Sequence, residues 1–179
     1  MTVDPEADGS VEDGDTIEEL LLSAGIVEET PAGNDLRLTD EFESTWHRLS
    51  KQMRDSDRVM RWFARTRNVP RERVETTTYG ELFVIEIDGS VAGRWPSEAA
   101  FLAETVVRPT LREWLPESEY ERLSPDLFRK LSSRLLLFLE RCPSCDGELA
   151  FADEDDDEIV RVSLSCTACG ATLFRGTDG

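Results

Sequence analysis

The C-terminal part of the fold is decided by the stretch CPSCDGELAFADEDDDEIVRVSLSCTACG, residues 142–170. Two C-x-x-C pairs, Cys142/Cys145 and Cys166/Cys169, enclose 20 residues. Each pair lets two thiolates reach one metal ion from a tight turn, and two pairs complete a closed tetrahedral set of four sulfur ligands. We therefore expect one structural zinc ion, bound by Cys142, Cys145, Cys166 and Cys169.

The residues between the two pairs read as a β-hairpin. Residues 148–152 and 159–165 form the expected arms, residues 153–158 form an acidic tip, and residues 171–175 are long enough for a third strand. Residues 142–175 thereby resemble a zinc ribbon, a resemblance that is specific for metal but not for function. The acidic tip repels phosphate, so we expect no nucleic-acid contact there. Two alternatives to zinc are iron in a rubredoxin-like site and a thiol redox pair. Few aromatic residues flank the cysteines and neither pair opens a helix after a strand, which disfavours both.

The composition is strongly acidic. The chain of 179 residues has 38 Asp and Glu against 20 Lys and Arg, a net charge of −18, and only Lys51 and Lys130 are lysines. This pattern is typical of cytoplasmic proteins of salt-loving archaea, where carboxylates keep the surface hydrated. No secretory signal or membrane-spanning run is evident. We expect a cytoplasmic protein with reduced cysteines, which favours metal binding over disulfides.

The rest of the chain predicts an α+β domain over residues 16–141, preceded by a disordered acidic tail at 1–15. Two small hairpins are expected near 26–39 and 82–95, the second around Asp88-Gly89. Asp40 and Glu43 suggest a capping box for a helix from residue 40, and Pro109 should kink or restart a helix that begins after Ser97. Other helices are expected at 16–24, 57–67 and from Ser124-Pro125 onward.

A basic segment interrupts the acidic chain. Residues 48–73 hold nine basic and three acidic residues, a net charge of +6. Arg54, Arg58, Arg61 and Arg65 follow steps of 4, 3 and 4 residues, which would place them on one helical face. Such a row suits phosphate binding, but the arginines can equally pair with the chain's own carboxylates or meet a protein partner.

No catalytic motif is recognisable, and His47 is the only histidine. The whole chain resembles short acidic haloarchaeal proteins with a C-terminal zinc ribbon. The resemblance is carried by LRLTDEFESTW (36–46), GRW (93–95), PSEAAFLAE (96–104) and CPSC (142–145). It implies an α+β architecture and a cytoplasmic location, and brings no activity.

We interpret the chain as a non-enzymatic zinc-ribbon protein that acts as an interaction or regulatory module with a protein partner. No membrane contact or small-molecule substrate is inferred. The alternative that remains open is a nucleic-acid-binding regulator that uses the Arg54–Arg65 face, and an enzyme with an unrecognised site is a third hypothesis.

Overall fold

The computed structural model describes residues 10–156 and 159–177. Helix α1 (Ser10–Ser23) begins within the segment 1–15 that we expected to be a disordered tail, while residues 1–9 lie outside the described residues. α1 ends at Ser23, close to the expected end of the helix at 16–24, and is followed by Gly25, which adopts a left-handed backbone with φ of 70°.

The N-terminal hairpin is confirmed and leads into two helices. β1 (Val27–Glu29) pairs with β2 (Leu36–Leu38), followed by α2 (Asp40–Met53) and α3 (Ser56–Thr66). The N-cap of α2 is Thr39, whose hydroxyl accepts a hydrogen bond from the backbone amide of Phe42. The predicted capping box, which began at Asp40 and ended at Glu43, was therefore displaced by one position. The Asp55 side chain caps α3 by accepting hydrogen bonds from the backbone amides of Asp57 and Arg58, so this helix begins one residue before the expected start at residue 57.

The second hairpin is part of a three-stranded sheet. β4 (Leu82–Ile87) pairs with β5 (Ser90–Trp95) around Asp88-Gly89, as expected. The unpredicted strand is β3 (Val74–Tyr79), which follows a short 3₁₀ turn, η1 (Arg71–Arg73), and pairs with the other edge of β4. Only Val74 of β3 is buried, so this strand lacks the alternating apolar pattern that identifies strands in a sequence.

Three helices follow this sheet. α4 (Glu98–Trp114) is capped by the Ser97 hydroxyl and continues through Pro109, so the helix does not restart there. The short helix α5 (Glu117–Glu121) was not predicted. α6 (Pro125–Leu137) begins at Ser124-Pro125 as expected. α4 is the centre of the fold, because ten of its residues are buried.

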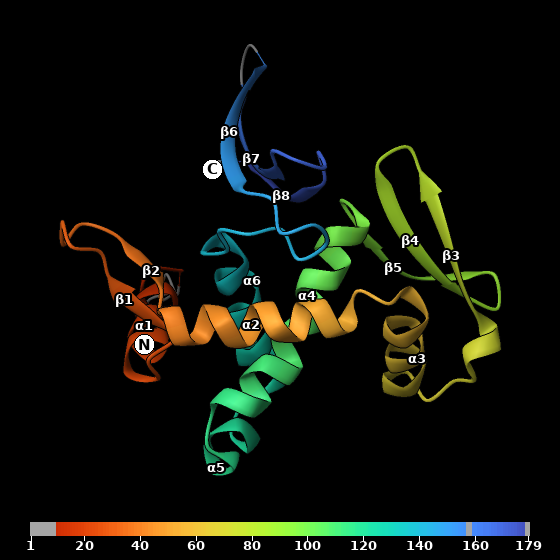
Figure 1. The fold of residues 1–179 in the computed structure, drawn as a ribbon, viewed down its shortest axis with the longest axis horizontal. Helices are drawn as coiled ribbons and strands as arrows, with labels where there is room; N and C mark the ends of the chain where they lie inside the picture. Colours follow the sequence, from red (N-terminus) through yellow and green to blue (C-terminus); the bar gives the residue numbers. More distant parts are fainter. Residues whose placement is uncertain (1–9, 157–158, 178–179) are drawn as a thin grey trace, which may run out of the picture.

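The C-terminal sheet has the order β6 (Leu149–Asp156), β7 (Ile159–Cys166) and β8 (Thr172–Thr177), all antiparallel. The expected two arms and third strand are therefore present, and residues 157–158 of the acidic tip lie outside the described residues. In Figure 1 this sheet stands at one end of α4 and α6, while α1–β2 and α3–β5 lie at opposite ends of α2.

One hydrophobic core joins all of these elements. Phe42 of α2 contacts Trp114 of α4 edge to face, with 5.3 Å between ring centroids. At the other end of α4, Phe101 packs against Phe63, Phe83 and Trp95. Leu164 and Leu173 of the C-terminal sheet belong to the same core. The structure is thus mixed α and β, as the sequence predicted. None of the helices in the described residues has the length and apolar character needed to span a bilayer.

Candidate metal centre

The four cysteines come together in space. Cys142 and Cys145 lie in the turn that follows α6, and Cys166 and Cys169 lie in the turn that joins β7 to β8. All four sulfur atoms are within 4.8 Å of one another. The Cys145–Cys166 and Cys142–Cys169 sulfur distances are 3.4 and 3.9 Å. Sulfurs around a tetrahedral zinc lie about 3.8 Å apart, since each Zn–S bond is about 2.3 Å. This donor set can hold one metal ion.

The backbone around the sulfurs is shaped for thiolates. The amides of Gly147 and Cys169 donate to the sulfurs of Cys145 and Cys166 at 3.4 and 3.5 Å. A Cβ on Gly147 would lie 2.7 Å from the Cys166 sulfur and 3.2 Å from the Cys145 sulfur. Only glycine fits there without pushing the sulfurs apart, so the residues present fit a compact four-sulfur site.

Burial and hydrogen bonding give the thiols different acidities. Burial raises the pKa of Cys142 to about 12, although the amides of Ser144 and Cys145 partly offset it. For Cys166, burial acts to raise the pKa, but hydrogen bonds to its sulfur from the backbone amides of Cys169 and Ala168 act in the opposite direction. The net effect lowers the pKa of Cys166 to about 7. For Cys169 burial prevails and the pKa is raised. A divalent cation that binds four thiolates must therefore displace protons at neutral pH.

The first cysteine turn is fastened to α2 by charged groups. Asp146, directly after Cys145, adopts a left-handed backbone with φ of 64°. Its carboxylate accepts hydrogen bonds from Arg54, at the C-terminus of α2, and lies 3.2 Å from His47 Nδ1. Arg54 Nε also donates to the Pro143 carbonyl at 2.7 Å. The hydrogen bond from Arg54 holds the pKa of Asp146 below its usual value, so this pair is ionised at neutral pH.

Two further contacts connect the C-terminal sheet to the rest of the chain. The Ser97 hydroxyl, at the start of α4, donates to the Thr172 carbonyl of β8 at 2.6 Å. Arg175 of β8 forms an ion pair of 2.9 Å with Glu81 in the β3–β4 turn. Cys142 and Cys166 are themselves buried, whereas Cys145 and Cys169 are exposed. The centre therefore lies at the junction between the sheet and the helices.

Residues 15–135 match the Family of unknown function (DUF8054) central domain. The chain belongs to the DUF8054 family. The match covers every element from β1 to α5, together with the second part of α1 and most of α6, and it ends before the first cysteine. No curated protein and no solved structure matches the chain. In this chain, the candidate metal centre is thus attached to the end of a DUF8054 domain.

The structure separates the four arginines of the expected basic face. Arg54 is the C-cap residue of α2, before α3 begins, and its side chain is turned toward Asp146. Arg61 pairs with Asp57 on α3, and Arg58 donates to the Gln52 carbonyl at 3.2 Å. Arg65 is exposed and has no hydrogen-bonding or ionic partner among the residues that the structure describes. Two of these arginines in the DUF8054 domain therefore pair with carboxylates of the same chain.

Asp146 and His47 were not predicted from the sequence as neighbours of the cysteines. Asp146 is 92 residues from Arg54 along the chain, so only the tertiary fold reveals their pairing. One local feature of the sequence could have indicated the role of Asp146. A charged residue that directly follows a C-x-x-C turn is well placed to contact the element that supports the turn.

Proposed function

We propose that the chain is a non-enzymatic zinc protein in which one zinc ion, held by the four cysteines, fixes a C-terminal zinc ribbon against the DUF8054 domain. The observation that carries this proposal is the mutual approach of the four sulfurs within 4.8 Å. Four protein ligands complete a tetrahedral zinc site and leave no open position for substrate, which is the arrangement of structural rather than catalytic zinc. So small a sheet has little core of its own without metal.

The proposed role of the assembled protein is that of an interaction or regulatory module with a protein partner. Support comes from the outer strands of the ribbon, where Phe151 and Phe174 are 55% and 36% exposed. Both are paired in register with Leu164 of the central strand, so they lie on the same face of the sheet. Exposed aromatic pairs of this kind are characteristic of protein interfaces.

The proposed location is a reducing cytoplasm at high salt. Its support is the net charge of −18, with two lysines among the 20 basic residues, and four cysteines suited to bind metal as thiolates. Within the described residues, ion pairs such as Arg54–Asp146 are partly buried, and such pairs are less screened by salt than exposed ones.

Metal-dependent hydrogen exchange tests the structural part of this proposal. The protein with bound zinc should show slow amide exchange in β6–β8, and Cys166→Ser should lose zinc and this protection while α2 and α4 stay protected. Ser144→Ala is the matched control, because residue 144 lies in the first cysteine turn but offers no metal ligand. Unchanged zinc content in Cys166→Ser would refute the four-cysteine site.

A pull-down at high salt, with nuclease-treated and untreated samples in parallel, tests the interaction role. We expect a protein partner that is retained after nuclease treatment and lost in the variant Phe151→Ser/Phe174→Ser. Nuclease-sensitive capture that disappears with Arg58→Glu/Arg61→Glu would instead support the nucleic-acid alternative.

A further inference from the structure

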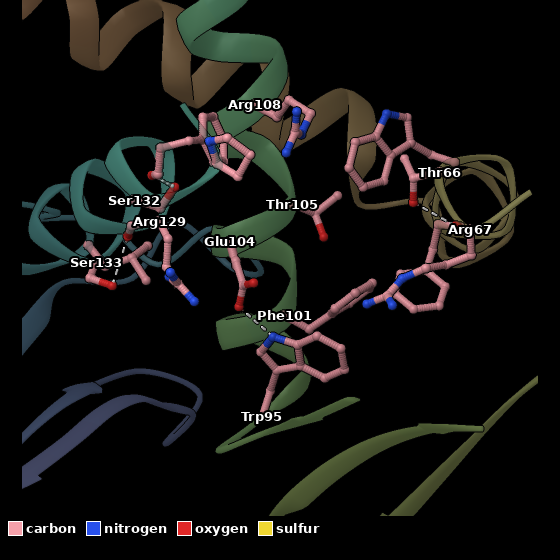
Figure 2. Close-up of a pocket in the computed structure, with 15 residues that line it drawn as sticks. Thr66, Arg67, Trp95, Phe101, Glu104, Thr105, Arg108, Arg129, Ser132 and Ser133 are labelled. Carbon is pink, nitrogen blue, oxygen red and sulfur yellow. Dashed lines mark hydrogen bonds between the residues drawn. The ribbon is translucent and has the colours of Figure 1, made fainter. Parts of the chain in front are cut away.

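A pocket of about 870 Å³ lies between α3, β5, α4 and α6, inside the DUF8054 domain and away from the cysteines. Its walls carry three arginines, one glutamate and several aromatic rings (Figure 2). The sequence analysis inferred no small-molecule site, because these residues come from separate segments and follow no linear motif.

Aromatic rings form much of the pocket surface. Trp62 of α3, Trp95 of β5 and Phe128 of α6 are half-buried, so each presents part of a ring to the pocket. Trp95 is held in place by Phe101, with ring centroids 4.7 Å apart, and by a hydrogen bond of 2.6 Å from its indole N–H to Glu104. These fixed ring faces suit a planar aromatic group, which stacks with little loss of side-chain entropy.

Positive charge gathers on the pocket rim, although the chain as a whole is strongly acidic. The guanidinium groups of Arg67, Arg108 and Arg129 point into the same space (Figure 2). Arg67 lies 5.1 Å from the Phe63 ring centroid and Arg108 lies 4.4 Å from that of Phe128. Neither pairs with a carboxylate among the described residues, whereas Arg129 pairs with Asp126. Stacking on a ring leaves the N–H groups of a guanidinium free to bind an anion.

An unpartnered hydroxyl also faces the pocket. Thr105 is 5% exposed, and Figure 2 shows its hydroxyl directed into the pocket. Neighbouring hydroxyls donate to a carbonyl one helical turn back: Thr110 donates to Val106 at 2.6 Å and Ser132 to Phe128 at 2.8 Å. Thr105 has no hydrogen-bond partner in the described part of the chain. The Thr105 hydroxyl itself is accessible from the pocket, unlike the buried and unpartnered Ser50 hydroxyl, so it is free to bond a polar atom of a ligand there.

We propose that this pocket binds a nucleotide. The base stacks against the tryptophan rings, the phosphate groups accept hydrogen bonds from Arg67 and Arg108, and Thr105 bonds a polar atom between the two. Glu104 distinguishes a nucleotide from an inorganic anion. Its carboxylate repels a bare anion but accepts hydrogen bonds from a base amino group or a ribose hydroxyl. A lipid tail would leave Thr105 without a partner and would offer Glu104 no hydrogen bond beyond the one from Trp95.

Tryptophan fluorescence of the full-length zinc-bound protein provides the test, at a salt concentration where circular dichroism shows it folded. ATP should quench the fluorescence with saturation, and adenosine and pyrophosphate should each bind at least about tenfold more weakly, since each supplies half of the contacts. Thr105→Val should weaken ATP binding, while Thr110→Val, the same change one turn along α4, should not.

Charge reversal on the same helix supplies a second matched pair. Arg108→Glu should weaken ATP binding by about tenfold or more, because it replaces a charge-assisted hydrogen-bond donor with a repulsive group. Arg112→Glu should leave ATP binding unchanged, since Arg112 stacks on Tyr120 outside the pocket. The proposal is overturned if ATP fails to bind at millimolar concentration, if pyrophosphate binds as tightly as ATP, or if Arg112→Glu weakens binding as much as Arg108→Glu. Tighter binding of a single-stranded oligonucleotide than of ATP would overturn the assignment to a free nucleotide.

Discussion

Arg54 donates hydrogen bonds to both carboxylate oxygens of Asp146 and so fastens the first cysteine turn to the C-terminus of α2. The third bond of this guanidinium, to the Pro143 carbonyl, lies within the turn itself. One side chain of the DUF8054 domain thus makes three hydrogen bonds to the first cysteine turn, and its position at the end of a helix limits how far the turn can move.

Replacing Arg54 should loosen this connection. Arg54→Gln should lower the free energy of unfolding by about 1–3 kcal/mol, because a partly buried carboxylate then loses its charged partner. Arg58→Gln is the control and should change it by less than about 0.5 kcal/mol, since Arg58 is exposed and bonds only to a carbonyl. Urea unfolding measures both. Equal effects of the two substitutions would show that the Arg54 contacts contribute nothing specific.

The contribution of the Asp146 carboxylate to the free energy of unfolding should depend on pH. The hydrogen bond from Arg54 lowers its pKa in the folded protein, so its stabilisation is fully present above the unfolded-state pKa of about 3.9 and is lost as pH falls through the lower folded value. Asp146→Asn retains a residue that tolerates the left-handed backbone but removes the charge. The difference in unfolding free energy between wild type and Asp146→Asn should be present at neutral pH and shrink below about pH 4. A difference independent of pH down to about pH 3 would contradict an ionic role.

Zinc binding should release protons. The pKa values of Cys142 and Cys169 are raised by burial, so both thiols carry protons at neutral pH and must lose them to bind metal. Calorimetry in buffers of different ionisation enthalpy should therefore report at least about two protons released per zinc at pH 7.5, and zinc affinity should fall as pH is lowered. Release of fewer than about one proton would mean that these thiols do not bind the metal.

Adding a methyl group at Gly93 should displace a wall of the pocket. A Cβ there would lie 2.3 Å from the Trp95 ring, so Gly93→Ala must push the indole out of its place between Phe101 and Glu104. We expect a changed near-ultraviolet circular dichroism spectrum and weaker ATP quenching. Val91→Ala, on an exposed position of the same strand, should change neither. A wild-type spectrum for Gly93→Ala would show that the ring is free to move.

Local signals predicted the elements whose ends are set by their own residues. Gly25 follows α1 and Ser124-Pro125 begins α6, and the cysteine spacing predicted the third sheet and the clustering of the four cysteines. The prediction was wrong where tertiary contacts decide the outcome. Arg54 follows the spacing of the arginines on α3, yet a carboxylate distant in the sequence binds it. α4 continues through Pro109 because packing on both sides outweighs the loss of one helical hydrogen bond. The pocket is lined by residues of four separate elements, so no sequence motif could have predicted it.

Metal analysis of the purified protein tests the central claim most directly. Plasma mass spectrometry combined with a protein concentration measurement should find one zinc and no iron per chain in the wild type and in Ser144→Ala, and none in Cys142→Ser. One zinc per chain that disappears with a single cysteine would establish the four-sulfur centre that holds the ribbon against the DUF8054 domain. Iron in place of zinc, or zinc that persists in Cys142→Ser, would contradict it.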